Sequence, residues 1–118
     1  MGETRVTIHV ATLRGERREA LEAVVDTGAT FSVIPTSTLK RLHIKRQEKI
    51  AVELANGRTI KRWSGEARIY INGKSRVCPV LFGLPQEPIL LGVTALEALG
   101  LTVDPIKGRL TPRAILLY

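Results

Sequence analysis

The sequence predicts an all-β protein with little helix. Short runs rich in Val, Ile and Leu recur along its 118 residues, and Gly and Pro separate them at short intervals. This pattern is typical of many short strands joined by turns. Apolar residues make up 44% of the chain but aromatic residues only 4%, so aliphatic side chains must build the core. At this length we expect one domain, residues 1–118, with its own core.

The hydrophobic pattern gives the expected elements in order. We expect strands over residues 4–11, 19–25, 31–34, 50–54, 59–63, 66–71, 76–82, 109–111 and 114–118. Pro79 would place part of one strand at an edge or a bulge. Short helices are favoured over residues 36–42 and 94–99, and Gly100 would end the second. Turns are expected at 14–16, at Asn56-Gly57 as type I′ and at Asn72-Gly73, with a rigid loop over 84–88.

One carboxylate occupies an unusual position. The apolar run of residues 23–25 delivers Asp26 into the tight turn Thr27-Gly28. Strands favour Val and disfavour Asp, so Asp26 marks the end of a buried strand. Gly28 permits a backbone path that a side chain would block. Asp and Thr are also common in ordinary turns, so the tripeptide alone leaves open both a structural turn and an acid–base site.

Three segments in order resemble the retropepsin-like aspartic proteases, the single-domain relatives of pepsin. Residues 24–31 resemble their active-site loop, and Ala55-Asn56-Gly57-Arg58 lies between two strand-like runs where that family has its flap hairpin. Residues 89–92 resemble the apolar-apolar-Gly segment before the family's short helix. The resemblance covers roughly residues 5–112. It implies a closed acid-protease barrel with one short helix that functions as a two-fold dimer.

The resemblance also implies a role for each matching residue. Asp26 would be the catalytic acid or base, Thr27 would brace two loops across the dimer axis, and Gly28 would let the substrate backbone approach. Ala29 completes this loop. The flap tip would close over an extended peptide, and apolar residues would form the pocket walls. The residues expected to contact substrate in these two ways are Ala55, Asn56, Gly57, Phe31, Leu84 and Ile89.

The chain departs from the retroviral proteases at two positions. Those enzymes often carry an acidic residue directly after Asp-Thr-Gly-Ala and an Arg directly after the later apolar-apolar-Gly. Here the two places hold Thr30 and Val93. Because both halves of the ion pair are absent together, no charge is left unpaired.

Aspartic proteolysis needs two carboxylates that share one proton. The chain has one Asp-Thr-Gly, and Asp104 is followed by Pro105, so Asp104 cannot form a second loop of that kind. A second copy of the chain would supply the partner carboxylate. The apolar strand expected at 114–118 would be an aggregation hazard unless that copy covered it. We therefore predict a homodimeric aspartic endopeptidase that acts on extended peptide or protein substrates.

Two other functions remain open. A catalytically silent peptide-binding or dimerisation module could use the same fold, and it would show no cleavage that depends on Asp26. A small basic β-barrel could instead bind nucleic acid, because the net charge is +7 and basic residues gather in 40–49. Such binding would depend steeply on salt. A solvated surface accounts for this segment more simply, so no nucleic-acid partner is expected.

No metal or other cofactor is expected, because His9 and His43 lack a Cys or acidic ligand set. The lone Cys78 fits packing within a strand and a reducing compartment. No apolar stretch approaches the length of a membrane span, and residues 1–20 lack the apolar region of a secretory signal. The expected location is therefore the cytoplasm, without membrane attachment.

Overall fold

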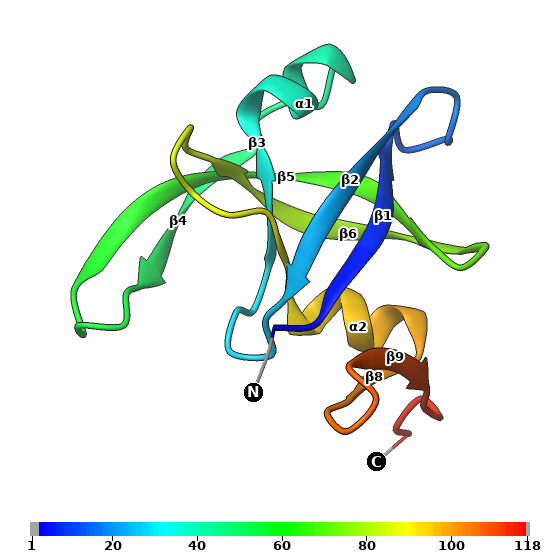
Figure 1. The fold of residues 1–118 in the computed structure, drawn as a ribbon. Coiled ribbons are helices and arrows are strands. Elements are labelled where there is room, and N and C mark those ends of the chain that lie inside the picture. The colour runs from blue at the N-terminus through cyan, green and yellow to red at the C-terminus, as the bar shows by residue number, and fades with distance from the viewer. Residues whose placement is uncertain (1–2, 118) are drawn as a thin grey trace.

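Strands dominate the computed structural model, which describes residues 3–117 (Figure 1). The elements are β1 (Arg5–Ala11), β2 (Arg18–Val25), β3 (Ser32–Pro35), α1 (Thr36–Arg41), β4 (Glu48–Glu53), β5 (Thr59–Ile71), β6 (Lys74–Gly83), β7 (Leu90–Leu91), α2 (Val93–Leu99), β8 (Leu101–Asp104) and β9 (Arg109–Pro112). The mostly-β prediction is confirmed. Both segments with helical spacing form helices, so the described residues hold two short helices where the expected fold class had one.

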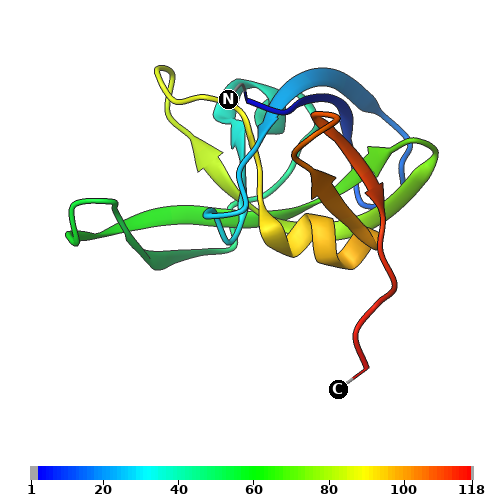
Figure 2. The ribbon, with the colours of Figure 1, turned by 60° about the horizontal axis from the view of Figure 1, so that its bottom comes forward.

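The strands of the main sheet are paired in the order β1-β2-β7-β3-β6-β5-β4. β1 pairs antiparallel with β2 and also with β5, through His9↔Tyr70 to Ala11↔Arg68. The pairings therefore lead through β2, β7, β3, β6 and β5 and return to β1. β4 pairs with the first part of β5, and together they project from the body as a two-stranded arm (Figure 2). β8 and β9 form a separate antiparallel pair.

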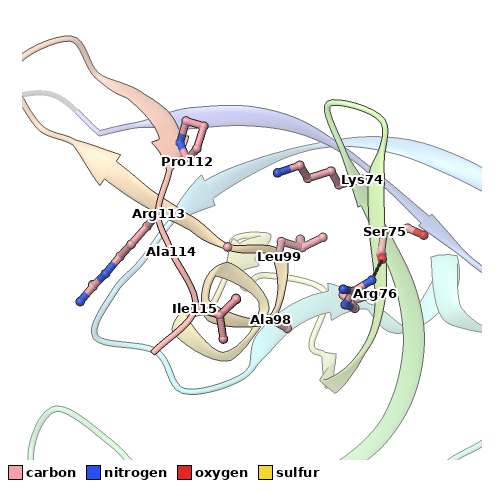
Figure 3. A pocket seen from close by; sticks show the side chains of 10 residues that line it. Lys74, Ser75, Arg76, Ala98, Leu99, Pro112, Arg113, Ala114 and Ile115 are labelled. Carbon is pink, nitrogen blue, oxygen red and sulfur yellow. Dashed lines mark hydrogen bonds between the residues drawn. The ribbon is translucent and has the colours of Figure 1, made fainter. Parts of the chain in front are cut away.

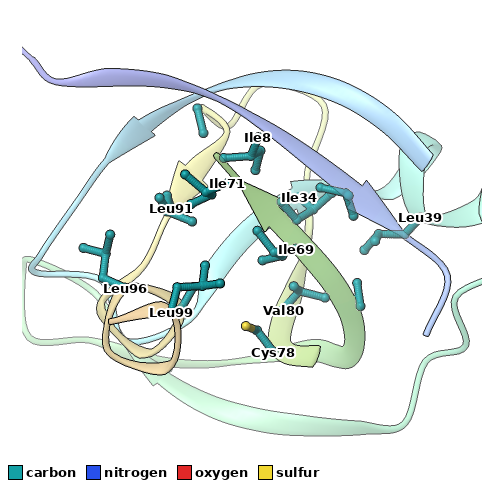
Figure 4. Close-up of a cluster of buried hydrophobic side chains, with 14 of the residues drawn as sticks. Ile8, Ile34, Leu39, Ile69, Ile71, Cys78, Val80, Leu91, Leu96 and Leu99 are labelled. Atoms are coloured by element: carbon teal, nitrogen blue, oxygen red, sulfur yellow. The ribbon is translucent and has the colours of Figure 1, made fainter. Parts of the chain in front are cut away.

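Aliphatic side chains fill the space that these strands surround, as the composition predicts (Figure 4). Every strand from β1 to β7 except β4 contributes to this core, and so do α1, α2 and β8. The large side chains include Ile8, Ile34, Leu39, Ile69, Val80, Leu91, Leu96 and Leu99. Each such side chain stabilises the fold by about 1.5–3 kcal/mol when fully buried, so α2 is held mainly by its apolar face.

β5 runs unbroken through residues 59–71, where the sequence indicated two strands. The Ser64 hydroxyl donates to the Glu48 carbonyl oxygen (2.9 Å), which keeps β4 paired at this point. A Cβ at Gly65 would lie 2.7 Å from the Lys45 carbonyl oxygen. Gly65 therefore marks the place where the backbone at Lys45 comes close to β5, and it does not break the strand.

The two Asn-Gly turns differ. Asn72 (φ 51°) and Gly73 (φ 82°) join Ile71 to Lys74 as a type I′ turn. The type I′ prediction for Asn56-Gly57 is wrong, because only Gly57 has positive φ (84°). There the Gly57 N–H donates to the Leu54 carbonyl oxygen (2.9 Å), and the Asn56 side chain accepts the Arg58 N–H (2.9 Å). The longer loop allows a turn that ends in a glycine bulge.

β6 and the C-terminal segment can also be compared with the strands expected from the sequence. β6 is continuous through Pro79, and its pairing with β3 begins one residue later at Ser32↔Val80. The missing Pro79 N–H thus falls where β6 is not yet paired with β3, as an edge position requires.

The expected strand at 114–118 is absent over residues 113–117, because no neighbouring strand among residues 3–117 offers hydrogen-bond partners there. Tyr118 lies outside the described residues.

β7 and β8 were not predicted as strands. β7 has only two residues, and β8 follows directly after the left-handed Gly100 that ends α2. Neither helix within residues 3–117 combines the length and apolar character needed to cross a membrane.

Candidate active site

Asp26 begins the loop that follows β2. Its backbone N–H donates to the Leu91 carbonyl oxygen (3.0 Å), which anchors it to β7. Its carboxylate Oδ1 accepts the Gly28 N–H (2.9 Å). Residues 3–117 make no other hydrogen bond to this carboxylate. Asp26 is partly exposed, and Thr27 and Gly28 are exposed, so the loop presents an oriented carboxylate at the surface.

Backbone hydrogen bonds join this loop to the start of α2. The N–H groups of Val93 and Thr94 donate to the carbonyl oxygens of Ala29 (2.8 Å) and Thr30 (3.1 Å). In both Figure 1 and Figure 2 the loop lies beside the first turn of α2. Thr30 and Val93 are the two positions where retroviral proteases often carry an ion pair. Here main-chain groups make the contact, so it does not depend on charged side chains.

Gly92 and Ser32 lie against the backbone of this loop and of the start of β3. A Cβ at Gly92 would lie 2.6 Å from the carbonyl carbon of Phe31 and 2.9 Å from the carbonyl oxygen of Ala29. Backbone presses on this position, so a side chain there would displace the loop. The Gly92 N–H donates to the hydroxyl of Ser32 (2.9 Å), which is 1% exposed. Ser32 was missed at the sequence level, although a hydroxyl within the apolar run 31–34 was its signal.

A family model described as "gag-polyprotein putative aspartyl protease" matches residues 11–98. The chain belongs to this family. The matched stretch contains the Asp26 loop, the arm formed by β4 and β5, and Gly92, so the resemblance found in the sequence is confirmed. No curated protein matches the chain.

In this member of the family, the expected flap tip is the end of the β4–β5 arm. Ala55, Asn56 and Gly57 are all exposed there. Figures 1 and 2 both show the arm projecting away from the body, with its tip separate from the Asp26 loop. The single chain therefore does not bring these residues together with Asp26.

The expected pocket-wall residues lie at two ends of β3. Phe31 directly follows the Asp26 loop and is partly buried. Ile89 precedes β7, and its carbonyl oxygen accepts the Val24 N–H (2.9 Å) next to that loop. Leu84 follows Gly83, which pairs with Pro35 at the opposite end of β3. Leu84 is 55% exposed, so of the three it has the most free side-chain surface.

An ion pair that the sequence did not reveal holds the loop after β6. Arg62 binds Glu87 through two contacts, Nη2–Oε1 at 2.6 Å and Nη1–Oε2 at 2.9 Å. The hydrogen bonds from Arg62 lower the pKa of the Glu87 carboxyl below its usual range, against the opposing effect of partial burial. The partners are 25 residues apart, and no spacing rule connects a strand residue with a loop residue at such a distance.

The other groups with potential chemistry lie elsewhere. Cys78 is buried in β6, and burial raises the pKa of its thiol to about 11. The thiol is therefore protonated near neutral pH, as its packing role predicts. Within residues 3–117, no three His, Cys, Asp or Glu side chains gather in an arrangement that could hold a metal ion.

Replacing Gly92 with Ala should destabilise the protein by about 3 kcal/mol or more, because the new Cβ would press on backbone and not on an adaptable side chain. Gly73→Ala is the matched control. Gly73 has positive φ but nothing within 4 Å of the added Cβ, so backbone strain alone should cost about 1–2 kcal/mol there. Urea unfolding measures both. A Gly92→Ala protein as stable as the control would contradict the close approach.

Replacing Glu87 with Gln should lower the free energy of unfolding at pH 7 by about 1–3 kcal/mol, since it removes charge-assisted hydrogen bonds. The pKa of Glu87 is lowered in the folded protein, so its stabilising charge is lost as the pH falls through that lowered value. The difference between the two proteins should therefore shrink between pH 7 and pH 3.

Unfolding at a fixed protein concentration across this pH range tests the prediction. Glu19→Gln is the control, because the Arg41–Glu19 pair has a similar geometry but its arginine is 57% exposed, whereas Arg62 is 11% exposed. The pKa of Glu19 is lowered in the same direction, but water screens the exposed pair, so its loss should cost less than the loss of Glu87 across the pH range. A stability gap for Glu87→Gln that stays constant with pH would be inconsistent with the charge as its origin.

Proposed function

We propose that this chain is an aspartic endopeptidase that hydrolyses extended peptides or proteins as a homodimer, with one Asp26 from each copy. The observation that carries the proposal is the Asp-Thr-Gly loop. Hydrogen bonds to β7 and α2 fix its backbone, and the carboxylate stays partly exposed. Such a group is oriented for chemistry and accessible to a substrate and to a second carboxylate.

The mechanism follows from two carboxylates at close range. Like charges about 3 Å apart cannot both ionise, so the pair holds one shared proton. The ionised carboxylate takes a proton from a water molecule, and the protonated carboxyl donates to the peptide carbonyl oxygen. The water oxygen then bonds to the carbonyl carbon, and the amine leaves after protonation. Thr27, exposed beside Asp26, would brace the two loops across the axis.

The C-terminal segment supports the dimer. Its backbone is held at Arg113, whose N–H donates to the Gly100 carbonyl oxygen (2.7 Å). Beyond this point Ile115, Leu116 and Leu117 are 67%, 72% and 83% exposed. Figure 3 shows the segment beside α2, where Leu99, Pro112 and Ile115 border a hollow. Consecutive apolar residues with free backbone groups require a partner strand, and a second copy across a two-fold axis supplies one.

The fold suits a peptide substrate. We propose that the ring of strand pairings is the acid-protease barrel and that residues 1–118 form one protease domain. The β4–β5 arm would close over an extended peptide and exclude water. The peptide would bind by strand addition, with alternate side chains directed into pockets. The wall residues Phe31, Leu84 and Ile89 favour apolar side chains beside the scissile bond.

Asp26→Asn should reduce cleavage of a peptide library by at least about a thousandfold, the scale on which loss of a catalytic group acts. Asp104→Asn is the matched control, because its Oδ1 only accepts N–H groups of the β8–β9 turn. Mass spectrometry of the digests and light scattering for the oligomeric state are the measurements. Peptide binding without cleavage by the unmodified chain would instead support the silent binding module.

Deleting residues 114–118 should give an inactive monomer, because the apolar segment that would pair with the second copy is removed. Sedimentation at several protein concentrations, together with the peptide assay, tests this outcome. A truncated monomer that still cleaves would refute both the interface and the requirement for two copies of Asp26.

Gly57→Val should leave the dimer intact but lower kcat/KM by at least about tenfold, or ~1.4 kcal/mol of transition-state stabilisation. Gly57 has positive φ at the arm tip, and nothing lies within 4 Å of an added Cβ, so the strain falls on the turn that closes over substrate. Gly73→Val imposes the same strain in another turn and should not change kcat/KM. Full activity of Gly57→Val would mean that residues 55–57 are not the flap tip.

A further inference from the structure

Arg62 lies where the arm leaves the ring of paired strands. From Ser64 onward β5 pairs with β6 through Ser64↔Leu81, whereas residues 59–63 pair with β4. Arg62 is therefore two residues inside the arm. Its side chain is 11% exposed, which is low for an arginine outside the core. This side chain turns back toward the body and reaches the loop after β6.

The contacts of Arg62 hold the backbone around Leu84. Arg62 Nη2 donates to the Phe82 carbonyl oxygen (2.9 Å), and its two Nη atoms hold Glu87. Glu87 in turn closes the loop, since its Oε1 accepts the Leu84 N–H (2.9 Å) and its own N–H donates to the Leu84 carbonyl oxygen (3.0 Å). The backbone of Leu84 is fixed on both sides, while its side chain is 55% exposed.

This pair differs from the other ion pairs of the described residues. Arg5–Glu22 has side chains that are 58% and 64% exposed, and such surface pairs contribute little to stability. The Arg62–Glu87 and Arg41–Glu19 pairs are both two-pronged, which adds geometric specificity as well as energy. Only the first has a shielded arginine, since Arg62 is 11% exposed and Arg41 is 57% exposed. Removing one partner would leave the other charge partly buried without compensation. The pair therefore constrains the geometry of the loop more than the surface pairs constrain theirs.

A fixed apolar wall discriminates between side chains, because a wall that cannot adapt loses contact with a smaller group. We propose that the Arg62–Glu87 pair is a positioning element of the substrate pocket. It holds Leu84 in place relative to the β4–β5 arm and thereby sets the discrimination between large and small apolar side chains beside the scissile bond. This inference rests on the proposed proteolysis and on Leu84 as a pocket wall.

The test compares kcat/KM for pairs of peptides that differ only by Leu or Ala at one position flanking the cleaved bond. The unmodified protein should separate the two by at least about tenfold at one such position, the scale expected for a side chain in an apolar pocket. Glu87→Gln should reduce that ratio at least about fivefold, mainly through KM for the Leu peptide. Arg62→Lys, which keeps the charge but loses the planar fork, should do the same.

Two further measurements separate positioning from general damage. Glu19→Gln removes a similar pair on another surface and should leave the ratio unchanged. Hydrogen exchange followed by mass spectrometry should show faster exchange in residues 82–88 for both pocket variants. In the double variant Arg62→Lys/Glu87→Gln the ratio should fall no further than in Glu87→Gln alone, because the two residues act as one unit.

The outcomes distinguish this inference from the proposed function. No cleavage by the unmodified protein would overturn both. Asp26-dependent cleavage with equal losses for the Leu and Ala peptides, or with a ratio unchanged in Glu87→Gln and Arg62→Lys, would overturn the positioning role alone. A ratio that falls as far in Glu19→Gln would also overturn it.

Discussion

The close approach of Gly92 to the backbone of Phe31 and Ala29 is the constraint on which the candidate site depends. Because no side chain intervenes, the loop carrying Asp26 can rest directly on β7 and on the first turn of α2. The Ser32 hydroxyl completes this contact by accepting the buried Gly92 N–H. Each link uses main-chain groups or a short hydroxyl, whose positions vary little. An oriented carboxylate at the surface is the result.

The long strand β5 connects the site with the rest of the molecule. Its second half pairs with β6 and β1 within the ring of strands, whereas its first half leaves that ring with β4. A single strand is therefore part of the rigid body and part of the projecting arm. Near the junction of these two halves, Arg62 reaches back to Glu87 in the loop that follows β6. This ion pair connects the arm with the loop that follows β6.

A single shielded ion pair matters more for the structure of this protein than its net charge. The net charge of +7 is spread over a surface on which ion pairs such as Arg5–Glu3 are more than half exposed. Such pairs are screened by water and salt. The shielded pair at Arg62 is different, because Arg62 also binds the Phe82 carbonyl oxygen and Glu87 also binds the Leu84 N–H. Because this pair ties the arm to the backbone of Leu84, the proposed positioning role rests on it.

The sequence by itself determined the all-β class, the site motif and most element positions. Val-rich alternation and Gly/Pro punctuation act over a few residues, so β1 to β4, β6, both helices and the Asn72-Gly73 turn could be predicted locally, and β5 only as two separate pieces. The Asp26 loop could be predicted because its motif is contiguous. The type I′ turn at Asn56-Gly57 failed because the length of the loop, and not the dipeptide, set the turn.

Only the tertiary structure decided the features that depend on distant partners. The unbroken course of β5 relies on Glu48 and Lys45 beside Ser64 and Gly65, and the Ser32–Gly92 and Arg62–Glu87 contacts join residues far apart in the chain. The strand expected over residues 114–118 is absent over residues 114–117, because a strand needs a neighbour and residues 3–117 pair none with it there. Local chemistry thus specified the carboxylate, and long-range packing specified what holds it.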